Sequence, residues 1–493
     1  MGIIEPAVTT TDHSGGSPHR PQGRSRSSTP ERSGRWIAAV AVLVVLTEQS
    51  ALGFQLIAPA LGGLAAKYET TQVIWTITIF TLVGGVVAPL IGKLGDRYGK
   101  RRVLVYAAVV SLIGSVISAL APSFEVLLVG RALTGVSAAF LPITIALMRD
   151  VFPPRMRDIS ISIATNGVGV VTIAGPFIAG FFIDNISLES VFWFVGALSL
   201  IGAIGTIALI PESTVRNHSP IDFVGAIGLV AGVFALLFGI SQISSWEFAD
   251  PRTLGVLGAG ILILAAWWAW EKRTPEPFIE PTILTSRITS TVLLAYAFGG
   301  GAITVIASYL PTFLQTPREL GGSYGFGLDA TGVARYLVVP GVLTVVGGLV
   351  VGVFAKRYGF KFFLILGSGF IALGAAGLSI FTEHSWGPIV MYGIVGFGAM
   401  VYAAGPNLLM AVAPAEQRGV SAGVLSATMS IVGSLFAQIA GLVLSRNTAQ
   451  VVSGTPVYSG KGVALVFSLA AVMALVALVI SFYAPRNSES LEA

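Results

Sequence analysis

The sequence predicts an all-α polytopic membrane protein of 14 transmembrane helices, arranged as two pseudo-symmetric six-helix bundles with two helices inserted between them. Of its 493 residues, 54% are hydrophobic and only 11% are charged, and the mean hydropathy is +0.83. Soluble domains carry about a quarter charged residues, so this chain lies mostly in lipid. Crossing the hydrocarbon core takes about 20 apolar residues in a helix. Apolar stretches near or above this length lie at residues 36–60, 71–91, 103–121, 125–148, 159–183, 190–210, 223–244, 253–270, 288–314, 330–354, 362–381, 386–411, 419–444 and 462–484.

A short basic loop occurs twice and indicates an internal duplication. Residues 92–104, after the second stretch, read GKLGDRYGKRRVL, and residues 352–361 read GVFAKRYGFK. The two copies begin 260 residues apart, farther than six spans with short loops require, so two further spans are expected between the halves. We expect a disordered cytoplasmic tail, a first bundle, two inserted helices with their linker, a second bundle and a final tail, at residues 1–35, 36–215, 216–285, 286–484 and 485–493.

The distribution of cations sets the expected orientation. With the N-terminus inside, the inner loops and tails hold 22 of the 29 Lys and Arg residues and the outer loops hold five, while Arg131 and Arg335 lie within stretches. Positive charge gathers on the cytoplasmic side, and the pattern closes only with an even number of spans. We expect a multi-pass protein of a bacterial plasma membrane with both termini in the cytoplasm. The net charge of +5 is dispersed over many short loops, which argues against a nucleic-acid partner.

The first copy of the loop carries a pattern of Gly, Leu, Asp, Arg, Gly and Arg. This pattern resembles the loop signature of the major facilitator superfamily of transporters. The resemblance implies a conformational latch, in which the aspartate and arginine hold one bundle to the other, with a receiving element near Arg418 and Gly419. In the second copy Lys356 replaces the aspartate, so the same role is not assigned there. The alternative is a turn that merely obeys the positive-inside rule. The signature residues are Gly92, Asp96, Arg97, Gly99 and Arg101.

The fourteen-span layout resembles the drug:proton antiporter branch of that superfamily. Gly175, Pro176 and Gly180 in the fifth stretch are similar to the antiporter signature, which implies a kinked, glycine-lined helix. Proline bends a helix, and glycines let a neighbouring helix pack against the bend. Val171 and Ala179 depart from the signature, which usually has glycines there. The alternative is ordinary small-residue packing in a chain with 59 glycines.

Glu48 is the only acidic residue near the middle of a stretch. An ionisable group at that depth is costly and is a functional candidate by default. Glu48 lies about 18 Å, and Arg131 about 21 Å, from the inner membrane surface at 1.5 Å per residue. In the fold that the chain resembles, the first and fourth spans both face a central cavity. The hypothesis is that Glu48 exchanges a proton with substrate binding while Arg131 modulates its proton affinity. The alternative is a static buried ion pair that fixes helix packing.

The residue content excludes several kinds of chemistry. The chain has no Cys, and its four His residues, at positions 13, 19, 218 and 384, lie outside the stretches, so no metal site or cofactor is expected. A phosphate-binding loop for ATP is also absent from the sequence. The resemblance implies a monomeric exporter of hydrophobic or amphipathic small molecules driven by protons. Proton-coupled uptake or facilitated transport of a metabolite stays open, as does a polytopic membrane enzyme, for which the sequence offers no nucleophile or base.

Overall fold

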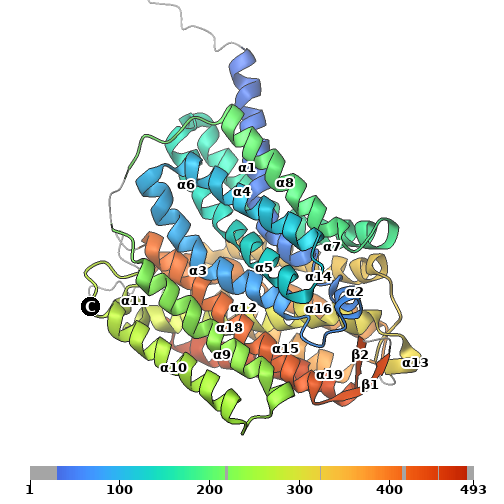
Figure 1. The fold of residues 1–493 in the computed structure, drawn as a ribbon. Helices are drawn as coiled ribbons and strands as arrows, with labels where there is room; N and C mark the ends of the chain where they lie inside the picture. The colour runs from blue at the N-terminus through green and yellow to red at the C-terminus, as the bar shows by residue number, and fades with distance from the viewer. Residues whose placement is uncertain (1–29, 217–219, 322–323, 413–417, 453–454, 486–493) are drawn as a thin grey trace, which may run out of the picture.

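The structure, a computed structural model, describes residues 30–216, 220–321, 324–412, 418–452 and 455–485, and these are almost entirely helical (Figure 1). Thirteen helices in the described ranges are long and apolar enough to cross a membrane, and the two parts of one bent helix make a fourteenth span. The predicted all-α fold with fourteen spans is therefore confirmed.

The helices divide into two halves and an insertion. The first half contains α1 (Pro30–Gln55), α3 (Trp75–Tyr98), α4 (Lys100–Ala119), α5 (Phe124–Thr134), the 3-10 helix η1 (Gly135–Ala139), α6 (Phe140–Val151), α7 (Pro154–Asn185) and α8 (Ser190–Leu209). The insertion is α9 (Phe223–Trp246) and α10 (Pro251–Glu271). The second half contains α12 (Arg287–Gln315), α14 (Ala330–Tyr358), α15 (Phe360–Ile380), α16 (Trp386–Gly398), α17 (Val401–Val412), α18 (Arg418–Ser445) and α19 (Gly460–Tyr483). Short connecting elements are α2 (Leu61–Tyr68), α11 (Pro281–Thr285), α13 (Arg318–Gly321) and an antiparallel hairpin of β1 (Thr448–Val452) and β2 (Thr455–Tyr458).

The two halves repeat each other in detail. The fourth span of each half is broken near its middle: η1 separates α5 from α6, and a turn separates α16 from α17. A Cβ on Gly114 of α4 would lie 2.7 Å from the Gly130 carbonyl oxygen, and a Cβ on Gly374 of α15 would lie 2.5 Å from the Met391 carbonyl oxygen. Gly374 follows Gly114 by 260 residues, the offset of the duplicated loop. The same close helix approach is thus made twice, in equivalent places.

The duplicated loops share a backbone conformation that favours glycine. Gly99, between α3 and α4, has a φ of +113°, and Gly359, between α14 and α15, has a φ of +80°. Residues with a Cβ rarely adopt such angles, whereas glycine adopts them readily. The two glycines therefore produce the same sharp reversal between consecutive spans, although the charges around them differ.

The two halves meet along two seams, α3 against α18 and α7 against α14. We call the end of the molecule where α1 begins the N-terminal face. The opposite end is the hairpin face, because α2, which follows α1, contacts β2. Hydrogen bonds between the halves gather toward the hairpin face. In the first seam, the Gln438 amide donates to the Thr78 hydroxyl at 3.0 Å, and the hydroxyls of Thr81 and Ser434 share a bond of 2.9 Å.

In the second seam, Asp184 at the end of α7 joins the start of α14. Its carboxylate accepts hydrogen bonds from the Thr331 backbone N–H at 2.8 Å and the Thr331 hydroxyl at 2.6 Å. Farther along, a Cβ on Gly169 would lie 3.0 Å from Val345. Gly348 and Gly352 continue the same side of α14, yet a Cβ on either would meet no described atom within 4 Å. The seam is thus closed at the hairpin face and separates toward the N-terminal face.

The inserted helices cover only one seam. Helix α9 contacts both α3 and α18, and α10 packs on α9 (Figure 1). The rings of Trp75 in α3 and Phe234 in α9 lie 5.6 Å apart between centroids. The α3–α18 seam is therefore covered by the insertion, which lies away from α7.

Three features differ from the sequence-based expectation. Helix α1 begins at Pro30, so the predicted tail is wrong over residues 30–35, while residues 1–29 lie outside the described part. The first span ends at Gln55 rather than at residue 60, and the separate helix α2 follows it. The β1–β2 hairpin was not predicted, because its residues between two spans are too few and too polar to show a strand pattern above the surrounding apolar signal.

Candidate functional site

The Glu48 carboxylate lies inside the protein, where α1 meets α7. The residue is 7% exposed, and neither carboxylate oxygen has a hydrogen-bond partner among the described residues. The carboxylate lies against Gly167 of α7, so close that a Cβ on Gly167 would overlap its Oε1 atom. A charged group without partners is costly to bury. The Glu48 carboxylate therefore contributes no hydrogen bond to the described part of the fold.

Helix α7 bends at the residue that Glu48 contacts. The segments Ile159–Thr165 and Gly169–Asn185 meet at 44°, and Gly167 lies in the break between them. Glycine has no side chain to stiffen the turn and tolerates a wider range of backbone angles. The buried carboxylate and the bend therefore lie at one place in the fold.

The neighbouring polar residue on α1 shows what a structural role looks like. The amide nitrogen of Gln49 donates to the Ser111 hydroxyl at 2.8 Å and to the Ser199 hydroxyl at 2.7 Å. These bonds tie α1 to α4 and α8. The residue equivalent to Glu48 in the second half, 260 positions later, is Ser308, whose hydroxyl donates to the Thr304 carbonyl oxygen at 2.7 Å. At these equivalent positions, only the first half carries an ionisable group.

Arg131 is almost completely buried, at 1% exposure, and it donates to two backbone oxygens and to the Thr134 hydroxyl. Its Nε donates to the Thr76 carbonyl oxygen at 3.0 Å, and its Nη2 donates to the Gly53 carbonyl oxygen at 2.9 Å. The guanidinium also lies over the Phe80 ring, 4.4 Å from its centroid. Arg131 therefore clamps α5 to α1 and α3 near the hairpin face.

Glu48 and Arg131 form no ion pair among the described residues, so the static pair considered as the alternative is not present in this structure. Arg131 meets α1 at Gly53, five residues beyond Glu48. Five residues turn an α-helix by about 140° past a full turn and advance it by about 7.5 Å, so Gly53 and Glu48 occupy different sides and levels of α1. The depth argument placed both residues in the membrane interior but contained no information about helix rotation. The described contacts of Arg131 and Glu48 therefore lie at different levels of α1.

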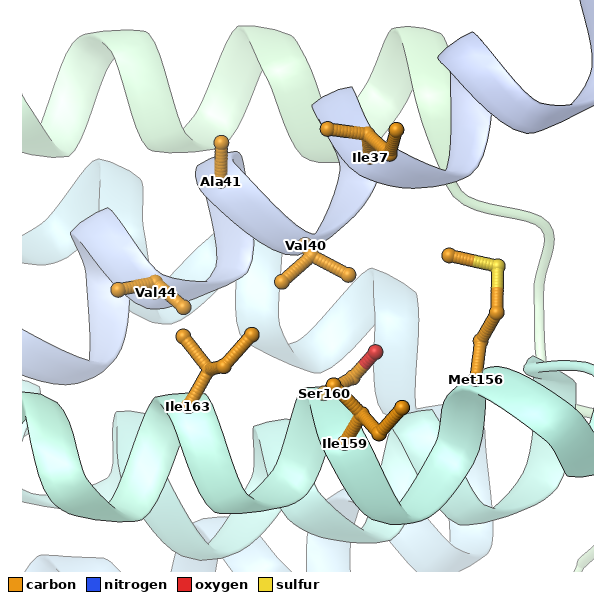
Figure 2. A pocket seen from close by; sticks show the side chains of 8 residues that line it. All are labelled: Ile37, Val40, Ala41, Val44, Met156, Ile159, Ser160 and Ile163. Carbon is orange, nitrogen blue, oxygen red and sulfur yellow. The ribbon is translucent and has the colours of Figure 1, made fainter.

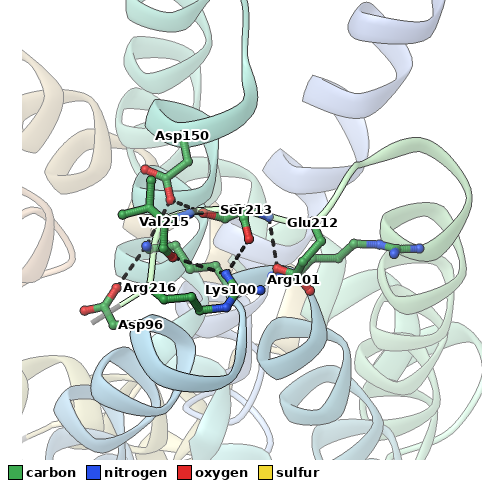
Figure 3. A network of polar contacts seen from close by, with 8 residues as sticks. All are labelled: Asp96, Lys100, Arg101, Asp150, Glu212, Ser213, Val215 and Arg216. Carbon is green, nitrogen blue, oxygen red and sulfur yellow. Dashed lines mark hydrogen bonds and ion pairs between the residues drawn. The ribbon is translucent and has the colours of Figure 1, made fainter. Parts of the chain in front are cut away.

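The loop after α3 forms a compact polar network at the N-terminal face (Figure 3). Lys100, at 6% exposure, places its Nζ 2.9 Å from an Asp96 oxygen and 2.9 Å from an Asp150 oxygen. The Ser213 hydroxyl donates to the same Asp150 oxygen. The network thus connects the α3–α4 loop to the end of α6 and to the segment after α8.

Glu212 caps the start of α4 from outside the helix. Its two carboxylate oxygens accept the backbone N–H groups of Arg101 and Arg102, each at 3.0 Å. These N–H groups have no partner within the helix and carry the positive end of its dipole, so a carboxylate is favoured there. A Cβ on Gly99 would lie 2.8 Å from the Glu212 carboxyl carbon, so Gly99 is needed for this approach as well as for the turn. The Arg101 guanidinium donates to the Ile207 carbonyl oxygen at the end of α8.

Three signature residues, Asp96, Gly99 and Arg101, lie in or beside this network, and their described contacts stay within the first half. Asp96 pairs with Lys100, Arg97 is exposed and lies beside its neighbouring tyrosine ring, and a Cβ on Gly92 would have open space around it. The proposed receivers Arg418 and Gly419 have side-chain positions outside the described set. A latch between the halves therefore stays a prediction.

The glycines of the predicted antiporter signature lie at helix contacts. A Cβ on Gly175 would lie 2.9 Å from Gln55 of α1, and a Cβ on Gly180 would lie 2.8 Å from the Thr331 backbone of α14. Pro176 lies inside α7, while the 44° bend lies about two turns before it. A separate kink at Pro176 stays a prediction. Gly175 and Gly180 let α1 and the second half approach α7.

Sequence reasoning missed Gly167, Asp150 and Glu212. Gly167 begins the run of glycines in the fifth stretch, but its contact with Glu48 depends on how two helices are rotated. Asp150 carried a weaker signal, because it follows Arg149 in a segment of the chain with more arginines than acids, whereas Glu212 carried none. Their partners come from 50 and 111 residues away along the chain. No spacing rule joins residues so far apart.

Comparison with known proteins identifies the fold family. The sequence model of the Major Facilitator Superfamily matches residues 43–225 and 221–437, which is most of the chain. The chain belongs to the Major Facilitator Superfamily. Two curated members are similar to it: a tetracenomycin C resistance and export protein of Streptomyces glaucescens is 28% identical over 67% of this chain and 61% of its own length. Multidrug resistance protein 3 of Bacillus subtilis is 26% identical over 57% of this chain and 54% of its own length. The chain thus spans little more than half the length of these superfamily members.

Solved superfamily structures share the fold. A human organic anion transporter superposes with a TM-score of 0.58 at 15% identity, covering 92% of this chain and all of that one. A peptide transporter of the POT family superposes with a TM-score of 0.63 at 16% identity, covering 90% of this chain and 96% of that one. At such identity these two superfamily members show the architecture alone.

Proposed function

We propose that this superfamily transporter exports hydrophobic or amphipathic small molecules in exchange for protons, working as a monomer by alternating access in a bacterial plasma membrane. Several of the curated relatives are named for multidrug resistance or export, which supports the export direction. Two duplicated halves that move about a midplane site are a known solution for alternating access. The observation that carries the proton coupling is the buried, unpartnered carboxylate of Glu48 against Gly167.

The N-terminal face is proposed to be cytoplasmic, because 22 of the 29 cations fall on that side in the fourteen-span arrangement. The described contacts close the molecule at the opposite, hairpin face, where Asp184 holds Thr331. With this proposed orientation, the described conformation would be the one open to the cytoplasm. The latch of Asp96 and Arg97 across the halves would form in the other state, when the N-terminal face closes.

The proposed cycle depends on what the carboxylate needs in its two protonation states. When protonated, Glu48 is neutral and can pack against Gly167 without a counter-charge. When ionised, it requires a cation or water, because an uncompensated charge in a dry site is costly. A proton taken up at the outer side and released at the inner side would alternate these states. The change in the protonation of Glu48 would alter the bend of α7 at Gly167.

The test is transport by purified protein in liposomes with an imposed pH gradient, read out with a fluorescent substrate. Glu48→Gln keeps the size of the side chain but cannot ionise, and we expect gradient-driven transport to fall at least tenfold while the protein remains folded. The matched control is Glu189→Gln, the same change at a carboxylate on the hairpin face, which should transport at the wild-type rate. Full-rate, proton-coupled transport by Glu48→Gln would contradict the coupling. Accumulation in the opposite direction would identify an uptake carrier.

A further inference from the structure

A narrow apolar groove runs between α1 and the first part of α7 (Figure 2). On the α1 side it is lined by Ile37, Val40 and Val44, and on the α7 side by Met156, Ile159 and Ile163. Its volume is about 390 Å³, enough for a small drug-sized molecule. Ile37 and Ile159 are 62% and 65% exposed, so the groove is open along the outer surface of the bundle. In a membrane that surface faces lipid.

One helical turn beyond the groove lies the Glu48 carboxylate, which has no hydrogen-bond partner among the described residues. Glu48 follows Val44 on α1 by four residues, and Gly167 follows Ile163 on α7 by four residues. Four residues are about one helical turn, or about 6 Å, and bring side chains to the same side of a helix. Glu48 and Gly167 therefore lie between the same two helices, one turn closer to the hairpin face than Val44 and Ile163. A molecule lying in the groove with one end toward the hairpin face would reach the carboxylate.

The equivalent helix pair in the second half is filled. A Cβ on Gly300 of α12 would lie 2.8 Å from Met429 of α18, and a Cβ on Gly301 would lie 3.4 Å from Val432. The side chain at the position of Glu48 is Ser308, which satisfies its own hydrogen bond. On the other seam, α9 covers the contact of α3 with α18. The α1–α7 pair thus combines an apolar groove with a buried carboxylate, and the equivalent α12–α18 pair has a serine at the position of that carboxylate.

We propose that the α1–α7 groove is a membrane-side binding site for a lipophilic cation, whose apolar body lies between Val40 and Ile163 and whose cationic N–H donor reaches Glu48. This deepens the proposed export function and rests on it. The apolar lining, with Ser160 as its one hydroxyl side chain, gives no polar anchor for a neutral hydrophilic molecule. The oxygens of Glu48 have no hydrogen-bond partner among the described residues, whereas the Arg131 guanidinium donates to the Gly53 carbonyl oxygen on another side of α1. Charge complementarity thus selects a cationic ligand that partitions into the leaflet at the N-terminal face.

The test measures binding apart from transport. Rhodamine 6G, a lipophilic cation with N–H donors, is titrated into the protein in liposomes without a pH gradient, and its fluorescence polarisation gives a Kd. Val40→Trp fills the groove from the α1 side and should raise the Kd at least tenfold. Ile163→Trp fills it from the α7 side and should have the same effect, so the result does not depend on the folding of one variant. The control is Val170→Trp, at an exposed valine of α7 that does not line the groove, and its Kd should match the wild type. Glu48→Gln should also raise the Kd at least tenfold.

The outcomes separate the groove from the export function. The proposed binding site is contradicted if both groove-filling variants keep the wild-type Kd. It is also contradicted if rhodamine 6G does not bind to the wild-type protein. If the wild type binds rhodamine 6G and both filling variants lose this binding, the binding site in the groove is supported. If the wild type nevertheless shows no gradient-driven transport of the dye, proton-coupled export is contradicted. If both filling variants export the dye at the wild-type rate under a pH gradient, the groove is not the binding site, while the export function still holds.

Discussion

The side chain of Glu48 lies in the space that a side chain on Gly167 would occupy, at the point where α7 changes direction by 44°. A buried acid and a flexible position in a neighbouring helix are therefore in direct contact. A change in the charge of one has a physical means of altering the geometry of the other.

Gly167→Ala tests this contact. The added methyl group overlaps the carboxylate, so either Glu48 turns away or α7 shifts, and overpacking of this kind costs about 1–3 kcal/mol. We expect at least a tenfold loss of transport and a lower melting temperature. Adding Glu48→Ala should recover the melting temperature but not the transport, because contacting residues are not additive. Gly348→Ala, where a Cβ meets open space, is the control. An unaffected Gly167→Ala protein would show that the contact is dispensable.

Lys100→Met removes the cation that two carboxylates share. Asp96 and Asp150 then lie close together without a cation between them, and the free energy of unfolding should fall by about 2–3 kcal/mol. The loss is smaller than for a fully buried pair, because Asp96 is half-exposed. Thermal unfolding in detergent measures the effect. Arg102→Met is the matched control: this side chain is 71% exposed and 4.0 Å from Glu212, so less than about 1 kcal/mol is expected. Equal effects from the two variants would refute the central role of Lys100.

The Lys67–Glu189 ion pair, with 2.6 Å between Nζ and Oε1, predicts a pH dependence for the attachment of α2. The hydrogen bond from Lys67 lowers the pKa of Glu189 below its usual 4.5. The attachment is therefore complete above pH 4.5 and weakens as the pH falls through the lowered pKa. Both side chains are about one-third exposed, so less than 1 kcal/mol is at stake. Hydrogen exchange of the α2 amides, corrected for intrinsic rates, should show this acid step in the wild type and lose it in Glu189→Gln. A step that persists in the variant must come from another group.

Asp184→Ala tests which contacts hold the hairpin face closed. The carboxylate caps α14 across the halves, and loss of such a cap costs about 1 kcal/mol, which is about a fivefold change in a two-state population. The chain has no cysteine, so spin labels on Leu120→Cys in the first half and Glu383→Cys in the second half, both exposed at that face, report the distance across it without background. The long-distance population should rise with Asp184→Ala and not with the control Asn185→Ala, whose amide bonds only to its own helix. Identical distance distributions would show that Asp184 does not control closure.

Sequence reasoning reached the spans, the duplication and the position of Glu48, because each depends on composition or on spacing along one helix. It failed where helices must be placed relative to each other. Arg131 was assigned to Glu48 by depth, but its donors meet the Gly53 and Thr76 carbonyl oxygens instead. Main-chain oxygens carry no signal in a sequence, so this arrangement could not be read from the residues. Glu212 likewise caps a helix that starts more than 100 residues earlier.

Gly99 and Gly359 hold the same left-handed turn, although Asp96 precedes one and Lys356 precedes the other. After the ancestral gene doubled, backbone handedness was retained while charge was free to diverge. At this turn the torsion angles therefore preserve the symmetry of the two halves better than the charges do. The loop of the first half carries an aspartate, while the loop of the second half shares only the backbone turn.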